Sequence, residues 1–235
     1  MGRPSRPGMS REGIARAALD LVDEQGADGL TMRAIADRLG VKAASLYHHT
    51  SGKDALIEAL AELVNAEIDL TPLAEETGDW RDALAAYARS YRAAFLRHPH
   101  TIALLARRQV AAERQLLGYE ALLAALGRVG LAPADAAEAA AALDYLVLGS
   151  ALETFSAGFT RPAHAYRPAY PALAGALEAS AARDEDARDG AARGESDRGE
   201  AARGAGGGPA GLDERGFELG LRLLLDGLAA RLPGR

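Results

Sequence analysis

The sequence predicts an all-α protein: an N-terminal three-helix domain that contains a helix-turn-helix, followed by a larger C-terminal helical domain. Alanine and leucine dominate, and aromatic residues make up only 5% of the 235 residues. A composition of this kind favours helices over strands. Apolar residues also recur at intervals of three and four in most segments, which is the spacing of one helix face.

The composition also narrows the class of protein. Hydrophobic residues make up 49% of the chain and cysteine is absent, so disulfides and cysteine-based metal sites are excluded. The sequence has no run of about 18 apolar residues and no signal-type hydrophobic region. We therefore expect a soluble cytoplasmic protein with no membrane partner.

The first helix is predicted to follow a disordered arm over residues 1–9, which are rich in proline and glycine. Ser10 suits the N-cap position, and Gly26 suits the end of the helix. Between them, apolar residues from Ile14 to Val22 form one buried stripe. The first predicted domain spans residues 10–55.

Residues 31–48 predict a helix-turn-helix within this domain. A short helix over Thr31–Leu39 is followed by a turn at Gly40 and a second short helix over Lys42–His48. The second helix is then free to enter a DNA major groove. The alternative is an ordinary helical hairpin in a core. Residues 1–60 hold eight basic and eight acidic residues, so DNA affinity must come from a few placed contacts and from dimerisation.

The second predicted domain, residues 56–235, serves ligand binding and dimerisation. Ser51-Gly-Lys-Asp54 predicts a capping box and a long helix whose first turn carries Lys53, held either by a phosphate or by solvent. The segment Ala134–Phe159 is apolar on nearly all sides, and Leu212–Leu232 has an apolar face, so both are expected to contact a partner subunit. Residues 175–210 are expected to form a mobile, low-complexity loop.

Residues 30–56 resemble the DNA-binding domain of the TetR family of transcriptional regulators. The resemblance rests on the sequence LTMRAIADRLGVKAASLYHHTSGKDAL, with its Leu-Tyr pair and its lysine at the start of the next helix. Further segments (Asp79-Trp-Arg-Asp-Ala-Leu, Arg97-His-Pro and Gly216-Phe-Glu-Leu-Gly-Leu221) resemble the ligand domain of the tetracycline repressor subgroup. The resemblance implies a homodimer that binds a palindromic operator on double-stranded DNA. It also implies that the protein is a repressor, which a small apolar effector releases from the operator.

The resemblance also assigns candidate residues. The expected DNA contacts are Thr31, Arg33, Lys42, Ala43, Ala44, Ser45, Tyr47, His48 and Lys53. The candidate ligand pocket comprises Tyr87, Tyr91, Phe95, Leu104, Leu105, Leu122, Leu123, Leu148, Leu152 and Phe155, each of which could equally be plain core. The expected dimer interface comprises Leu143, Val147, Phe217, Leu221, Leu224, Leu225 and Leu228.

The chain departs from the tetracycline repressor pattern where that pattern places a metal-binding histidine, because Thr101–Ala106 has none. A magnesium–tetracycline effector is therefore not expected, and we predict no metal site and no cofactor. The pair His98 and His100 is interpreted as a solvated loop. No catalytic constellation is recognisable, so an enzyme is not expected. The alternative function is a small-molecule-sequestering protein with a vestigial DNA-binding domain.

Overall fold

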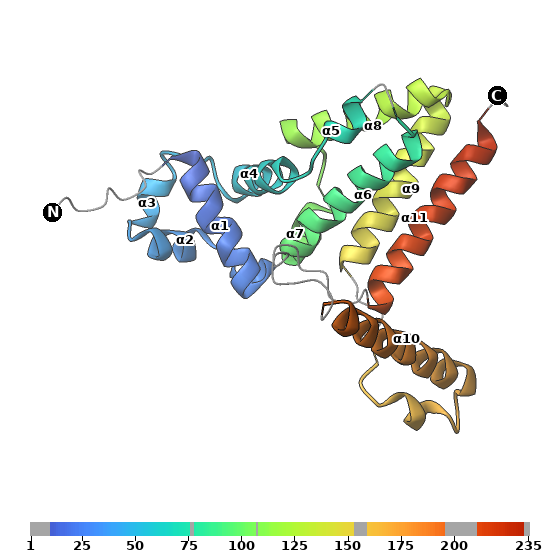
Figure 1. Ribbon diagram of the computed structural model, residues 1–235. Coiled ribbons are helices and arrows are strands. Elements are labelled where there is room, and N and C mark those ends of the chain that lie inside the picture. Colours follow the sequence, from blue (N-terminus) through green and yellow to red (C-terminus); the bar gives the residue numbers. More distant parts are fainter. Residues whose placement is uncertain (1–9, 76–77, 107, 153–158, 196–210, 233–235) are drawn as a thin grey trace. The chain divides into compact units, whose positions relative to one another are not determined.

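The computed structural model describes residues 10–75, 78–106, 108–152, 159–195 and 211–232 (Figure 1). Over these residues every regular element is helical, so the predicted all-α class is confirmed. In chain order the elements are α1 (Arg11–Gln25), η1 (Ala27–Gly29), α2 (Met32–Leu39), α3 (Ala43–Leu46), α4 (Lys53–Ala66), α5 (Thr71–Ala74), α6 (Trp80–Arg97), α7 (Pro99–Leu105), α8 (Glu113–Val129), α9 (Pro133–Leu152), η3 (Ala163–Tyr166), α10 (Pro171–Glu195) and α11 (Leu212–Arg231). The predicted arm lies outside the described residues.

The N-cap predicted for the first helix is present, and Thr31, which was predicted to be the first residue of the next helix, is its N-cap instead. The Oγ atom of Ser10 accepts a hydrogen bond from the backbone N–H of Gly13 at 3.0 Å, which fixes the start of α1. Thr31 caps α2 in the same way through the N–H of Ala34, at 3.1 Å. Gly40 ends α2 with φ 67°, a left-handed conformation that glycine adopts without a steric penalty. These local signals set the geometry of the helix-turn-helix.

The predicted capping box at the start of α4 is not formed. Gly52 is the N-cap, with φ 134°, and no side chain caps the backbone N–H groups of the first turn. Helix α4 nevertheless begins at Lys53 as expected, with Asp54 also in its first turn. The free N–H groups of this turn are therefore open to an external anion.

The chain forms two compact units. One comprises Met1–Leu152 together with Leu224–Arg235, and the other comprises Glu153–Leu223. In the first unit, α1 packs on α2 and α4, α6 packs on α9, and α8 contacts both α4 and α9. Helix α4 thus belongs to the core shared by the N-terminal helices and the larger helical domain, with Leu60 and Val64 completely buried.

The second unit corrects the prediction of a long loop. Where a loop was expected from residue 175, α10 continues as a helix to Glu195, and residues 196–210 lie outside the described part of the chain. Alanine-rich segments have high helix propensity, which the low-complexity reading underestimated. Within this unit Arg215 of α11 pairs with Asp184 and donates to Ser180 Oγ at 2.9 Å, so polar contacts hold α10 against α11.

Helices α9 and α11 carry the residues predicted for the dimer interface. Of the predicted residues, Leu224 is half-buried in the single chain and the others are already buried there: Leu143, Val147, Phe217, Leu221, Leu225 and Leu228. Their place in a dimer interface stays a prediction. The apolar side chains left exposed are Tyr145 and Leu152 on α9 and Leu219 and Leu223 on α11. A helix that is apolar on two sides does not reveal by periodicity which side faces its own chain.

No helix among the described residues combines the length and the apolar character needed to cross a membrane.

Candidate functional site

A polar, exposed surface surrounds the short helix α3. Each of the nine predicted DNA contacts lies exposed or half-exposed: Thr31, Arg33, Lys42, Ala43, Ala44, Ser45, Tyr47, His48 and Lys53. Tyr47, which directly follows α3, is 58% exposed although it is a large aromatic residue. An exposed aromatic residue with a hydroxyl, next to lysines and a histidine, suits contacts to a phosphate backbone.

Helix α3 is held rigidly from beneath. Leu46 is completely buried, and the backbone N–H of Val41 donates to Ala36 O at 2.9 Å across the turn. On the far side of α3, Nε of Arg11 donates to the carbonyl oxygen of His49 at 3.1 Å. The exposed residues of α3 are therefore presented on a fixed support, which base recognition requires.

The structure also shows what two of the predicted DNA contacts do in the free protein. The Oγ1 atom of Thr31 accepts a hydrogen bond from the N–H of Ala34 in the α2 cap, and its hydroxyl proton remains available to donate to a phosphate. The Arg33 guanidinium lies 3.9 Å from the Asp37 carboxylate, and its side chain is 91% exposed. Such a surface ion pair is weak, so Arg33 is free to reorient.

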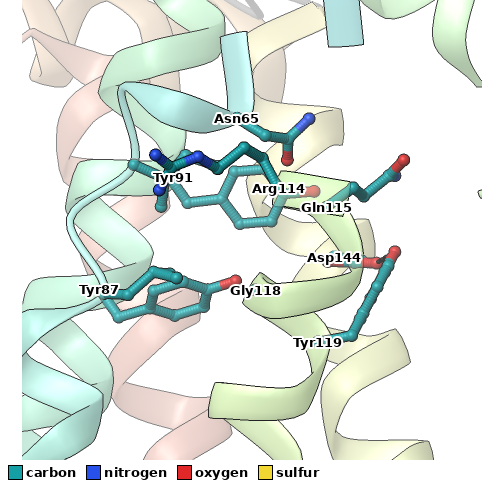
Figure 2. Close-up of a pocket in the computed structure, with 10 residues that line it drawn as sticks. Asn65, Tyr87, Tyr91, Arg114, Gln115, Gly118, Tyr119 and Asp144 are labelled. Carbon is teal, nitrogen blue, oxygen red and sulfur yellow. Dashed lines mark hydrogen bonds between the residues drawn. The ribbon is translucent and has the colours of Figure 1, made fainter. Parts of the chain in front are cut away.

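A second site is a cavity within the larger helical domain (Figure 2). Four helices contribute to it: Asn65 comes from α4, Tyr87 and Tyr91 from α6, Arg114, Gln115, Gly118 and Tyr119 from α8, and Asp144 from α9, with Ile68 and Leu70 completing the wall. Figure 2 shows the two α6 tyrosines extending towards α8. Aromatic faces are thus combined with amide, phenol, guanidinium and carboxylate groups.

Asp144 is the one acidic residue among the described residues that line this cavity. Burial raises the pKa of its carboxyl group, and the hydrogen bonds from Tyr119 and Tyr91 oppose that rise. The Tyr119 hydroxyl donates to Asp144 Oδ2 at 2.5 Å. Burial, together with the nearby Asp144 carboxylate, raises the pKa of Tyr87 and Tyr91 as well, so both phenols keep their protons. The cavity therefore offers several hydroxyl donors around one buried acceptor.

The cavity is small in this structure and partly open to solvent. Its volume is about 10 Å³, which is room for roughly one water molecule. Tyr91 packs against Tyr87, with ring centroids 5.9 Å apart, and against Phe95 in an edge-on arrangement at 5.4 Å. Any larger ligand needs the helices around the cavity to move apart.

The predicted pocket residues are only partly brought together. Tyr87 and Tyr91 line the cavity, Phe95 stacks behind Tyr91, and Leu122 is buried. Leu123 and Leu152 are exposed and are not among the residues that line this cavity, and Phe155 lies outside the described residues. The remaining leucines, Leu104, Leu105 and Leu148, are half-buried. Leu105 borders a separate cleft of about 460 Å³ beside the Asp54–Arg108 ion pair.

Sequence reasoning missed Asn65, Gln115, Tyr119 and Asp144. Asp144 carried a usable signal, because it is the one acid inside the apolar run of residues 139–152. A lone carboxylate in such a helix either faces solvent or has a functional role. The other three stand in ordinary amphipathic patterns, and only the arrangement of α4, α8 and α9 brings them together.

The raised pKa of Asp144 predicts a pH-dependent stability. The folded state holds this proton more tightly than the unfolded state, so the contribution is fully present below the unfolded pKa and is lost as pH rises through the folded pKa. Asp144→Asn stays neutral and keeps an oxygen acceptor for Tyr119. In urea titrations the unfolding midpoint of this variant is expected to rise relative to wild type as the pH increases from acid to neutral.

Tyr119→Phe is the matched control for that experiment. It removes a hydrogen bond that lowers the pKa of Asp144, so the fall in stability with rising pH should become larger than in wild type. Equal pH profiles for wild type and Asp144→Asn would contradict a raised pKa of Asp144 in the folded protein.

The fold and the two sites define a class of protein: a helix-turn-helix DNA-binding domain joined to a helical domain with an internal, polar cavity. Residues 14–60 match the family described as "Bacterial regulatory proteins, tetR family", and residues 71–189 match "Tetracyclin repressor-like, C-terminal domain". The chain therefore belongs to the TetR family. It is a transcriptional regulator with a DNA-binding domain and a ligand-binding domain.

Individual relatives agree with this assignment. The chain is 33% identical over 222 residues to the class A tetracycline repressor from transposon 1721 of Escherichia coli, covering 93% of this chain and 89% of the relative. A possible TetR family regulator from Streptomyces coelicolor A3(2) superposes with a TM-score of 0.71 at 28% identity, covering 94% of this chain and 99% of the other. A TetR variant from Acinetobacter baumannii AYE, solved with minocycline, gives 0.62 at 27% identity and covers 94% of each chain.

Neither site resembles a metal centre. Within the described ranges, no group of three or more histidine or acidic side chains is placed to hold a metal ion. His100, the histidine of α7, is turned towards α1, where its Nδ1 lies 3.0 Å from the carbonyl oxygen of Val22.

Proposed function

We propose that this regulator is a cytoplasmic repressor that binds a palindromic operator through the surface around α3 and leaves it when an effector opens the cavity. The observation that carries the proposal is that one helix reaches both sites. Helix α4 presents Lys53 in its exposed first turn and Asn65 in the cavity wall. We expect no catalytic activity from either site.

Contacts between α4 and α8 support this coupling. The Glu62 carboxylate of α4 accepts hydrogen bonds from the backbone N–H groups of Glu113 and Arg114, the latter at 3.1 Å, and so caps the start of α8. Arg114 and the residue that follows it in α8, Gln115, line the cavity. A ligand that pushes α8 outward therefore pulls on α4. Its differential affinity for the open arrangement would shift DNA binding.

The effector that fits this chemistry is flat, aromatic and rich in oxygen, and not simply apolar. Tyr87 and Tyr91 offer ring faces and hydroxyl donors, Asp144 offers an acceptor, and Asn65 and Gln115 offer both. The minocycline complex of a relative shows that one member of this family binds a ligand of that kind. For this chain, the recognition of such molecules by these residues is our proposal.

The dimer is proposed to form through apolar side chains that the single chain leaves exposed. Tyr145 is 77% exposed and Leu152 60% on α9, while Leu223 is 64% exposed on α11. Exposed large apolar groups repeated along helices commonly mark an interface. Two copies would present two α3 helices to two half-sites about one DNA turn apart.

Tyr47→Ala is expected to weaken DNA binding by roughly one order of magnitude on every sequence tested, because a phosphate contact carries no sequence information. Fluorescence anisotropy with operator and with unrelated DNA measures this. Tyr170→Ala, at a tyrosine of similar exposure (56%) outside the DNA-binding domain, is the control and should change neither affinity. Unchanged affinity in Tyr47→Ala would show that the docking surface is misassigned.

Selection of DNA fragments by the purified protein tests the proposed function as a whole. Enrichment of a palindrome, and its release by a flat aromatic compound, is the expected result. If no fragment is enriched at moderate salt while aromatic compounds still quench tyrosine fluorescence, the sequestering function with a vestigial DNA-binding domain replaces the proposal.

A further inference from the structure

His98 stands where the N-terminal helices meet the larger helical domain. It ends α6 and precedes α7, and its backbone is fixed on both sides. Its N–H donates to Phe95 O at 3.2 Å, and its carbonyl oxygen accepts from Thr101 Oγ1 at 2.6 Å. The side chain is only 14% exposed. The expectation of a solvated histidine loop is therefore wrong for His98.

Both ring nitrogens of His98 face carboxylates. Nδ1 lies 2.7 Å from Asp23 Oδ2 on α1, and Nε2 lies 3.1 Å from Glu67 Oε1 at the end of α4. A neutral imidazole has one N–H donor and one bare lone pair, whereas ionised carboxylates only accept. Two such contacts are both favourable only when the ring carries a proton on each nitrogen.

The surrounding charges favour this state. Arg97 donates to Glu67 Oε2 through Nε at 2.7 Å. Burial raises the pKa of Glu67, but hydrogen bonds from Arg97 and His98 lower it overall, so Glu67 is an ionised acceptor. Asp23 Oδ1 is buried and has no hydrogen-bond partner among the described residues, which leaves His98 as the group facing that carboxylate. His100 nearby is held by the backbone of Val22.

We propose that His98 is a positively charged positioning residue, which fastens α1 and the end of α4 to the α6–α7 corner by donating one hydrogen bond to Asp23 and one to Glu67. Each bond joins a different helix to the same ring. Loss of the second proton would leave one carboxylate facing a lone pair and would loosen that helix. The consequence for DNA binding rests on the proposed function, whereas the charge of the ring and the fastening do not.

The charge is tested by nitrogen NMR of the full-length protein labelled with [15N]histidine, with His98→Gln identifying the resonances. Two N–H-type nitrogens for His98 at neutral pH are expected. If one ring nitrogen of His98 carried no proton, the proposal would be overturned. Either Asp23 or Glu67 would then be a protonated acid that donates to that nitrogen, or one of the two contacts would be broken in solution.

The fastening is tested by hydrogen exchange. In His98→Gln, amides at the end of α1 and of α4 are expected to exchange roughly tenfold faster. This is the effect expected from losing one hydrogen bond to a charged group. Adding Asp23→Asn to this variant should restore part of the protection at α1, because a neutral amide then replaces the carboxylate whose Oδ1 atom is buried without a hydrogen-bond partner. His100→Gln, two residues away, is the control and should leave the α4 end unchanged.

Two results would count against a charged positioning role. One is equal exchange in wild type and His98→Gln, and the other is the absence of recovery when Asp23→Asn is added. None of these readouts needs an operator or an effector.

Discussion

Leu223→Asp is expected to turn the dimer into a monomer and to abolish measurable operator binding. The Leu223 side chain is 64% exposed in the single chain, so the substitution leaves the fold intact. In the proposed dimer it would place a carboxylate against apolar groups, at a cost of several kcal/mol. The monomer presents one α3 helix and loses the second half-site. Light scattering and gel shifts measure the two effects.

Two further substitutions make this experiment decisive. Leu96→Asp introduces the same charge at an exposed leucine of α6, 41% exposed, and should leave the dimer intact. Leu225→Asp buries the charge within the chain itself, because Leu225 is only 6% exposed, and should lower the unfolding midpoint. A Leu223→Asp protein that remains a dimer would show that the second subunit contacts another face.

Leu46→Ala is expected to destabilise the DNA-binding domain by about 2–5 kcal/mol, as a large-to-small change at a filled core position does. Leu46 is the buried anchor of α3 and is completely shielded from solvent. Since α3 has only four residues, it has no stability without this anchor. Operator affinity should fall with the folded fraction of the domain.

Urea unfolding, followed by circular dichroism and by exchange of α3 amides, measures that loss. Leu96→Ala removes the same atoms from an exposed leucine and should change stability by less than about 0.5 kcal/mol. If Leu46→Ala unfolds at the urea concentration of wild type, α3 does not depend on this core contact.

The DNA-binding domain could be predicted in detail because its signals are local. Ser10 and Gly40 each act on the residues within one turn of them, and the structure places Ser10 as the N-cap of α1 and Gly40 as the residue that ends α2. The cavity could not be predicted in the same way. Asn65, Tyr91, Tyr119 and Asp144 come from four helices, and nothing in the sequence gives the angles at which those helices cross.

The faces of α9 and α11 show a different limit. Leu221 and Leu225 are buried, while Leu219 and Leu223 are exposed, although all four lie within a stretch of seven residues. A hydrophobic pattern records that a side chain avoids water, but not whether its own chain or a partner shields it. In α10 the prediction of a loop was wrong, because charged and alanine-rich repeats form a helix there with little buried surface.

The length of helix α4 determines how far its Lys53 end moves when the helix tilts about its cavity end. Lys53 and Asn65 lie about 18 Å apart along it, at about 1.5 Å of rise per residue. If the helix pivots as a rigid rod at its cavity end, a tilt of roughly five degrees displaces the other end by about 1.6 Å. That distance is enough to take a phosphate contact out of hydrogen-bonding range. A repressor of this geometry can release DNA with every helix still folded, by leverage alone.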